Sequence, residues 1–166
     1  MLSGVKINGV KLKKNGTARI TNRVKKKVDL LLRYQKLVDQ MTVPLEDNHT
    51  KLVRVFKYAR DLNLKDLGDP TYAWNWDQIY AEMFLQSRYG DCVVASCGFA
   101  YMANAIGYEN VSVRLYFRSH AEINKRIYDP GFAKTVSDYN YTQYFDRAYS
   151  DLPDWGTFPG INTRFI

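Results

Sequence analysis

The first half of the chain has apolar residues at helical spacing. Thr21 or Asn22 is a suitable cap for a first helix, and Pro44 lies just beyond its expected end. The apolar positions between them recur mostly every three or four residues, at Val24, Val28, Leu31, Leu32, Leu37, Val38 and Met41. This stripe predicts a helix with one face buried against the rest of the protein.

Two shorter helices are expected next. The first of them begins at His49 or Thr50, and the second begins at Asn75 or Asp77. A Gly-Asp-Pro loop at 68–70 separates the two. The first half of the chain is therefore predicted to be helical.

A fourth helix is predicted to follow Gly90-Asp91, which places Cys92 in its first turn. The helix is expected to end at Gly107, about four turns later. It is rich in small residues, namely Ala95, Gly98, Ala100, Ala103 and Ala105. Because small side chains let neighbouring elements approach closely, this helix is expected to be buried at the centre of the fold.

After Gly107 the apolar pattern changes to the alternation that is typical of strands. Strands are predicted at 111–117, 120–124 and 126–129, and a tight turn is predicted at Asn124-Lys125. The three strands are expected to be consecutive antiparallel neighbours in one sheet.

The predicted turn also fixes which residues face each other. With the turn at Asn124-Lys125, the numbers of facing residues sum to 249, so His120 faces Asp129. Facing residues have Cβ atoms about 4.5–5.5 Å apart, which brings a carboxylate within reach of an imidazole.

The segment before the first helix is predicted to be a small appendage. Asn8-Gly9 and Asn15-Gly16 interrupt an alternating pattern, and Asn-Gly favours hairpin turns. The predicted organisation is therefore a basic hairpin or linker at 1–20, followed by a single domain at 21–166. The length of 166 residues fits one core.

Positive charge is concentrated at the start of the chain. Residues 1–28 contain nine Lys or Arg and no Asp or Glu; the remaining residues have 15 basic and 17 acidic side chains, a balance of about −2 within a total of +7. The basic run is either a solvated face or a contact for an anionic polymer, such as a wall teichoic acid or a nucleic acid. No nucleic-acid-binding motif accompanies it, so no specific nucleic-acid partner is predicted.

Cys92 is the candidate nucleophile. Donors and the dipole at a helix start are expected to lower the pKa of a thiol, and the thiolate is the reactive form. His120 is the candidate base, and Asp129 the residue that orients it. Read alone, Cys92 also fits a buried structural thiol, which is the interpretation preferred for Cys97. Two cysteines do not make a disulfide scaffold or a zinc site, so no metal or other cofactor is predicted.

The order and spacing of these residues resemble the transglutaminase-like cysteine peptidase superfamily, of bacterial type. The resemblance spans roughly residues 24–135 and rests on Gly90-Asp91-Cys92, Ala95, Gly107, His120-Ala121 and Asp129-Pro130. It implies an α+β, papain-like fold in which N-terminal helices pack on an antiparallel sheet, with Cys92 on a central helix. Glu122 departs from the family pattern, which usually has an aromatic residue two positions after the His.

Several residues are candidates for the oxyanion site or the substrate groove. Gln86 lies six residues before Cys92, as the oxyanion Gln of papain-like enzymes does, but it also fits a helix surface. The indole groups of Trp74 and Trp76 either donate hydrogen bonds there or serve as core aromatics. Tyr89 and Tyr128 flank the motif residues and are expected to line the site.

The resemblance implies an enzyme that acts on a peptide or protein amide through a Cys-His-Asp triad. A thioester would form and pass to water (hydrolysis) or to an amine (acyl transfer). The alternative is a non-catalytic cell-surface binding module that retains the fold. No stretch is long and apolar enough for a membrane span, and the expected location is extracellular or at the cell wall.

Overall fold

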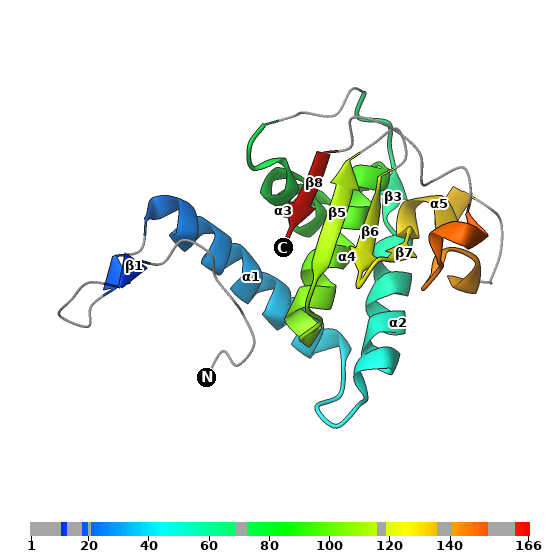
Figure 1. Cartoon of the computed structure of the whole chain (residues 1–166), viewed down its shortest axis with the longest axis horizontal. Coiled ribbons are helices and arrows are strands. Elements are labelled where there is room, and N and C mark those ends of the chain that lie inside the picture. Colours follow the sequence, from blue (N-terminus) through cyan, green and yellow to red (C-terminus); the bar gives the residue numbers. More distant parts are fainter. Residues whose placement is uncertain are drawn as a thin grey trace.

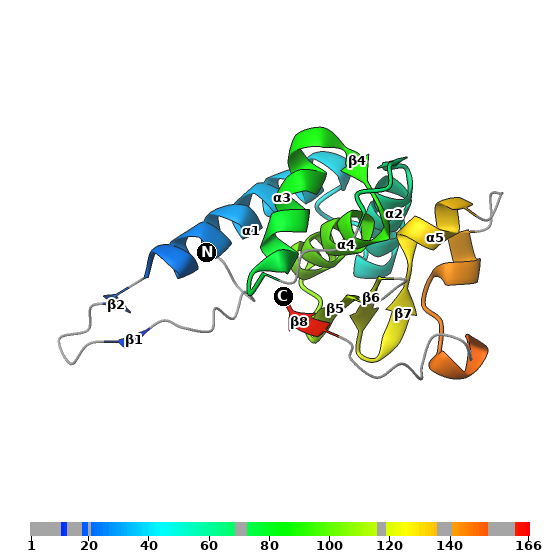
Figure 2. The same ribbon diagram turned by 90° about the horizontal axis from the view of Figure 1, so that it is seen from above.

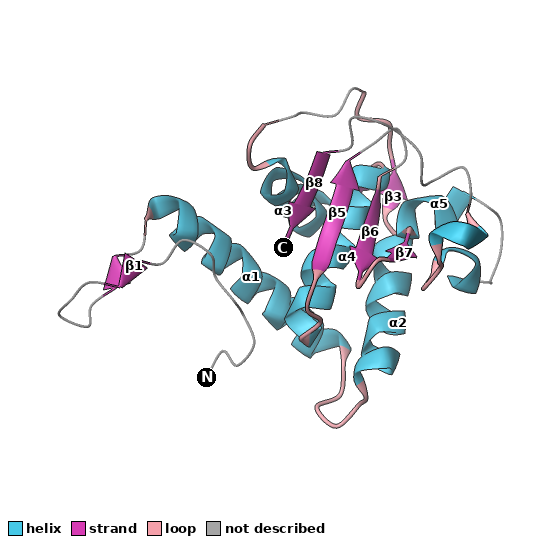
Figure 3. Ribbon diagram, in the orientation of Figure 1, coloured by secondary structure: helices cyan, strands magenta, loops and turns pink. Residues whose placement is uncertain are grey.

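A computed structural model describes residues 11–12, 18–19, 21–68, 73–115, 119–135, 141–152 and 162–166. Five helices are present among them, α1 (Asn22–Met41), α2 (Asn48–Arg60), α3 (Trp76–Ser87), α4 (Cys92–Ile106) and α5 (Pro130–Thr135). The longer strands are β5 (Val111–Leu115), β6 (His120–Ile123), β7 (Arg126–Tyr128) and β8 (Asn162–Phe165). The described part is thus a mixed α+β structure (Figure 3).

Helix α1 begins and ends where the sequence predicts. The Thr21 side chain accepts a hydrogen bond from the Val24 N–H, and Met41 is the last helical residue. Helix α2 begins one residue earlier than predicted, because Asp47 is its cap and accepts from the Thr50 N–H at 2.9 Å. A carboxylate at this position satisfies a helix donor that has no partner inside the helix.

Helix α4 lies at the centre of the helical layer. Its residues from Val93 to Met102 are buried without exception, and α1, α2 and α3 pack mainly against it. Gly98 permits one of these approaches, because a β-carbon there would collide with the Phe84 ring. Gly107 ends the helix at a φ of 111°, in the left-handed region that favours glycine.

The main sheet is antiparallel, in the order β7-β6-β5-β8. The predicted register is confirmed, because Ala121 pairs with Tyr128 and Ile123 with Arg126. Asn124 and Lys125 form the turn, both with positive φ. The predicted strand at 111–117 is seen as β5 as far as Leu115, and its end lies outside the described residues.

The layering differs from the prediction in one respect. The N-terminal helices were expected to pack directly on the sheet. Instead, α4 makes the main helical contacts with β5 and β6. Figure 2 shows α4 between the sheet and the helices α1, α2 and α3. A helix this apolar on all sides needs cover on both faces, which explains its middle position.

Smaller elements surround this core. A short parallel pair joins β3 (Asn63–Leu64) to β4 (Tyr89–Gly90), just before α4. Two 3₁₀ helices, η1 (Tyr141–Tyr144) and η2 (Tyr149–Asp151), follow α5 and return beside β7 through the Ile127–Arg147 bridge.

The N-terminal hairpin prediction is partly inside the described residues. β1 (Lys11–Leu12) and β2 (Ala18–Arg19) pair antiparallel, with Leu12 opposite Ala18. This pairing agrees with a turn around Asn15-Gly16, although those two residues and Asn8-Gly9 lie outside the described part. Figure 1 shows β1 at the far end of α1, away from the main sheet. The division at residue 20 remains a prediction.

Candidate active site

Cys92 is the first residue of α4. Asp91 caps the helix, and its Oδ1 accepts hydrogen bonds from the N–H groups of Val93 at 3.0 Å and Val94 at 3.2 Å. The short β3–β4 pair holds the chain immediately before this cap, through the hydrogen bond from Lys65 N to Gly90 O at 2.9 Å. The chain is thus held by the β3–β4 pair before Asp91 and by α4 after it, and together these fix the position of Cys92.

The thiol lies in a pocket of about 350 Å³. Most of the exposed lining is apolar, but its ionisable side chains are three carboxylates, one lysine and the thiol itself. The lining residues are Leu64, Lys65, Asp66, Asp91, Cys92, Asp129, Gly131, Phe132 and Thr135. The pocket brings together two of the three predicted catalytic residues, Cys92 and Asp129.

The pKa of the Cys92 thiol is raised to about 11, and the predicted lowering is wrong for this structure. Burial is the main cause, and the negative charges of Asp129 and Asp91 act in the same direction. A backbone hydrogen bond from Ser119 acts in the opposite direction but is outweighed. The N–H groups of Val93 and Val94 are already bound to the Asp91 carboxylate. The N–H of Cys92 itself still acts on the thiol, but its effect is smaller than that of burial.

Asp129 and the start of α5 close one side of the pocket. The Asp129 Oδ1 accepts from the Phe132 N–H at 2.7 Å, so this carboxylate caps α5. Gly131 lies so close that a β-carbon on it would be 2.7 Å from the Cα of Cys92. Asp129 is fully buried and adds negative charge beside the sulfur.

His120 opens strand β6 and is 2% exposed. Its neighbour Ser119 connects it to α4, because the Ser119 carbonyl accepts from the Ser96 hydroxyl at 2.9 Å and the Ser119 backbone also acts on the Cys92 thiol. The imidazole Nε2 lies 3.1 Å from the hydroxyl oxygen of Tyr149. The two rings meet edge to face, with centroids 6.0 Å apart.

A buried carboxylate, Glu122, completes this group. Its Oε1 lies 3.6 Å from the His120 Nε2 and 2.6 Å from the Arg114 Nε, and it accepts a hydrogen bond from the Tyr149 hydroxyl. Burial alone would raise the pKa of Glu122, but hydrogen bonds from His120 and Tyr149 and the charge of Arg114 hold that pKa below its ordinary value. Glu122 is therefore a charged group at neutral pH.

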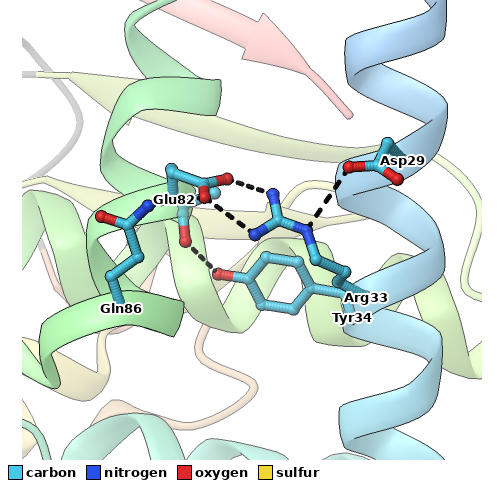
Figure 4. A network of polar contacts seen from close by, with 6 residues as sticks. Asp29, Arg33, Tyr34, Glu82 and Gln86 are labelled. Carbon is cyan, nitrogen blue, oxygen red and sulfur yellow. Dashed lines mark hydrogen bonds and ion pairs between the residues drawn. The ribbon is translucent and has the colours of Figure 1, made fainter.

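The structure does not bring Gln86 to the thiol. Gln86 is exposed on α3, and its amide donates to the Glu82 Oε1 at 2.8 Å. It lines a separate hollow between α1 and α3, where Glu82 also pairs with Arg33 (Figure 4). The spacing of six residues before Cys92 was the only basis for an oxyanion role, and this geometry does not support it.

The four aromatic candidates are also placed outside the lining of the Cys92 pocket. Trp74 is exposed under the Arg23 guanidinium, and Trp76 is fully buried in the core. Tyr89 is exposed on β4. Tyr128 is buried, stacks on Phe99 and donates to Asp146 at 3.1 Å. Trp76 and Tyr128 thus belong to the packing of the domain.

Three residues around His120 were not predicted as its partners. Glu122 was noticed only as a departure from the family pattern, and Arg114 was not considered. The tyrosine-rich C-terminal segment that contains Tyr149 was expected either to cover the groove or to pack on the sheet. One sequence feature could have pointed to Glu122: it lies two residues after His120 on the same strand, so the two side chains share a face of the sheet. A buried carboxylate requires a partner, and here Arg114 and Tyr149 provide it.

Comparisons with protein-family models, curated proteins and solved structures gave no match. Within the described ranges, no helix is long and apolar enough to cross a membrane. The same residues contain no group of three or more His, Cys, Asp or Glu side chains suited to a metal ion.

Proposed function

We propose that this chain is a transglutaminase-like thiol enzyme with a papain-like core, which acts on an amide bond of a peptide or protein. The observation that carries the proposal is the position of Cys92, at the start of the central helix and in the wall of a 350 Å³ pocket. The backbone of Ser119 forms a hydrogen bond with the Cys92 sulfur, and the next residue in the chain is His120.

The chemistry follows from the state of the thiol. Because its pKa is about 11, Cys92 is protonated at neutral pH and must lose its proton as it attacks. His120 takes that proton, and the sulfur forms a bond to the amide carbonyl carbon. The amine then leaves with the proton from His120, which produces a thioester. Water or a second amine cleaves the thioester and regenerates the thiol.

The pocket also favours a class of substrate. Among the described lining residues, Asp66, Asp91 and Asp129 place three carboxylates in the wall, and Lys65 provides one cation. A neutral amide or an amine is compatible with such a wall, whereas a carboxylate close to the sulfur would be repelled. We place the enzyme outside the cell or at the cell wall, where peptide amides and amines are both abundant.

A non-catalytic binding module remains the second candidate. The raised pKa of Cys92 favours it, because a protonated thiol is a poor nucleophile without a base. The two candidates differ in whether Cys92 is consumed or acylated when an amide substrate is present.

The test incubates the full chain with glutamine-containing peptides and cell-wall peptides, with and without a primary amine, and detects the products by mass. Cys92→Ala should abolish every product and preserve the fold. Cys97→Ala is the matched control: Cys97 is fully buried, so its loss should cost about 1–3 kcal/mol of stability and leave activity in the folded protein. Product formation by Cys92→Ala would overturn the proposal, and peptide binding without any product would favour the binding module.

A further inference from the structure

The contacts of His120 with Tyr149 and Glu122 determine which imidazole nitrogen carries the proton. The imidazole Nε2 faces the Tyr149 hydroxyl at 3.1 Å, and that hydroxyl in turn donates to Glu122. Arg114 approaches the same carboxylate from β5, at 2.6 Å. These contacts form a chain from the imidazole to a buried ion pair.

Each link of the chain has a defined direction. An ionised carboxylate only accepts hydrogen bonds, and the ion pair with Arg114 keeps Glu122 ionised. The Tyr149 hydroxyl has a single proton, which it gives to Glu122. Burial and the bond to Glu122 raise the pKa of Tyr149, so this proton stays on the phenol. The phenolic oxygen is therefore left to accept a hydrogen bond from His120.

We propose that Glu122, acting through Tyr149, is a positioning residue that holds neutral His120 with its proton on Nε2 and its lone pair on Nδ1. Nδ1 is then the nitrogen that takes the proton from the thiol, a use that rests on the function proposed above. After that transfer the imidazolium has the Glu122 carboxylate 3.6 Å from Nε2, which stabilises its positive charge.

This assignment differs from the predicted triad, in which Asp129 orients the imidazole. Asp129 has a second task at the pocket, because its Oδ1 caps α5 through the Phe132 N–H. Among the described residues, the charged and titratable groups around His120 include Arg114 on β5, Glu122 on β6, Tyr149 on η2, Asp129 at the next position of the β7 register and Cys92 through Ser119. Tyr149 and Glu122 both lie within 4 Å of Nε2, at 3.1 and 3.6 Å.

The proton position can be read directly by ¹⁵N NMR of the imidazole. The chain has only two histidines, so a His49→Gln background leaves His120 as the single reporter. At pH 8 the full chain should show a protonated Nε2 and an unprotonated Nδ1. In Tyr149→Phe and Glu122→Gln the preference should be lost, and the two tautomers should mix. Tyr149→Phe removes one oxygen from a half-buried side chain, so the fold should persist.

Arg114→Lys is the matched control, since it alters the same cluster but keeps the charge beside Glu122 and should keep the Nε2–H form. A protonated Nδ1 in the unsubstituted protein, or an unchanged tautomer in both Tyr149→Phe and Glu122→Gln, would overturn the proposal. Alkylation of Cys92 by iodoacetamide at pH 7 provides the second readout, with an expected slowing of about 10- to 100-fold in both variants. If the tautomer behaves as expected but alkylation does not change in the variants, the positioning of His120 stands and the proposed function fails.

Discussion

Gly131, at the start of α5, packs directly against Cys92, at the start of α4. A β-carbon on residue 131 would lie 2.7 Å from the Cα of Cys92 and 2.9 Å from its Cβ. Both atoms belong to a helix that is fixed on all sides, so neither can move away easily. The close approach brings the Asp129 carboxylate and the thiol into the same pocket.

Gly131→Ala should therefore disturb both the fold and the thiol. Overpacking of this kind costs about 1–3 kcal/mol, and the displaced α5 should carry Asp129 away from Cys92. We expect a lower melting temperature and an altered rate of Cys92 alkylation by iodoacetamide. Gly98→Ala is the control, because it overpacks the core against Phe84 on a later turn of α4. An equal effect of the two substitutions on alkylation, once stability is matched, would show that Gly131 has no special relation to the site.

The reactivity of the thiol should depend strongly on pH. Because the pKa of Cys92 is about 11, its alkylation rate in a His120→Gln variant, where no imidazole assists the thiol, should rise about tenfold per pH unit between pH 7 and 10. Asp129→Asn should lower that pKa, because it removes a negative charge near the sulfur and can keep the bond to the Phe132 N–H. A rate that is already constant above pH 7 would instead show a preformed thiolate.

The same pKa predicts a loss of stability in alkaline solution. The ordinary thiol value is 9.0, so the unfolded chain releases this proton before the native protein does as the pH rises. The contribution of Cys92 is fully present below pH 9 and is lost between about pH 9 and 11, at up to ~1.4 kcal/mol per pH unit. Urea unfolding at pH 7.5 and 10 should show a smaller decline in Cys92→Ala than in the unsubstituted protein. Equal declines in the two proteins would contradict the raised pKa.

The sequence was sufficient for the parts of the fold that depend on neighbouring residues. The end of α4 at Gly107 and the turn at Asn124-Lys125 are local features, and the turn alone determined the pairing of β6 with β7. The start of α2 was misplaced by one residue because Asp47, a better cap than His49, was not considered. The position of β8 beside β5 was not predicted, because no local pattern shows where a distant strand returns.

The electrostatics of the site depend on packing that no local pattern reveals. A helix start alone predicts a lowered pKa for Cys92, but burial of the thiol and the charges of Asp129 and Asp91 reverse the direction. The role of Glu122 depends on Tyr149, which is 27 residues away in the chain. The residue types of a site can thus be found from spacing, whereas their protonation states require the tertiary structure.

Two neighbouring residues of α1 fasten it to α3 in different ways (Figure 4). Arg33 pairs with Glu82 at an exposed position, whereas the Tyr34 hydroxyl donates to the Ala81 carbonyl at 2.7 Å inside the core. Arg33→Met should cost less than about 1 kcal/mol, and 1 M salt should reduce that cost. Tyr34→Phe should cost about 0.5–1.5 kcal/mol independently of salt, because it removes a buried hydrogen bond to a carbonyl that keeps its bond inside α3. Urea unfolding at two salt concentrations measures both, and a salt-sensitive Tyr34→Phe would contradict this assignment.

The basic residues that precede the core are the remaining candidate for a binding surface. Arg23, Lys25 and Lys26 are exposed on the first turns of α1, next to the β1–β2 pair. If this segment binds an anionic polymer, Lys25→Gln with Lys26→Gln should weaken binding to a polyglycerol phosphate probe, and the loss should shrink as salt increases. Lys36→Gln with Lys125→Gln removes the same charge from exposed positions elsewhere and should have a smaller effect.

Deletion of residues 1–20 extends this test to the predicted appendage. It removes five of the nine basic residues in 1–28, so binding to the polyglycerol phosphate should weaken further and depend less on salt. The alkylation rate of Cys92 should not change, because its pocket is lined by residues from Leu64 to Thr135. Equal binding before and after the deletion would show that the segment is only a solvated face. A slower Cys92 reaction would show instead that the N-terminal segment belongs to the domain that contains Cys92 and that the predicted division at residue 20 is wrong.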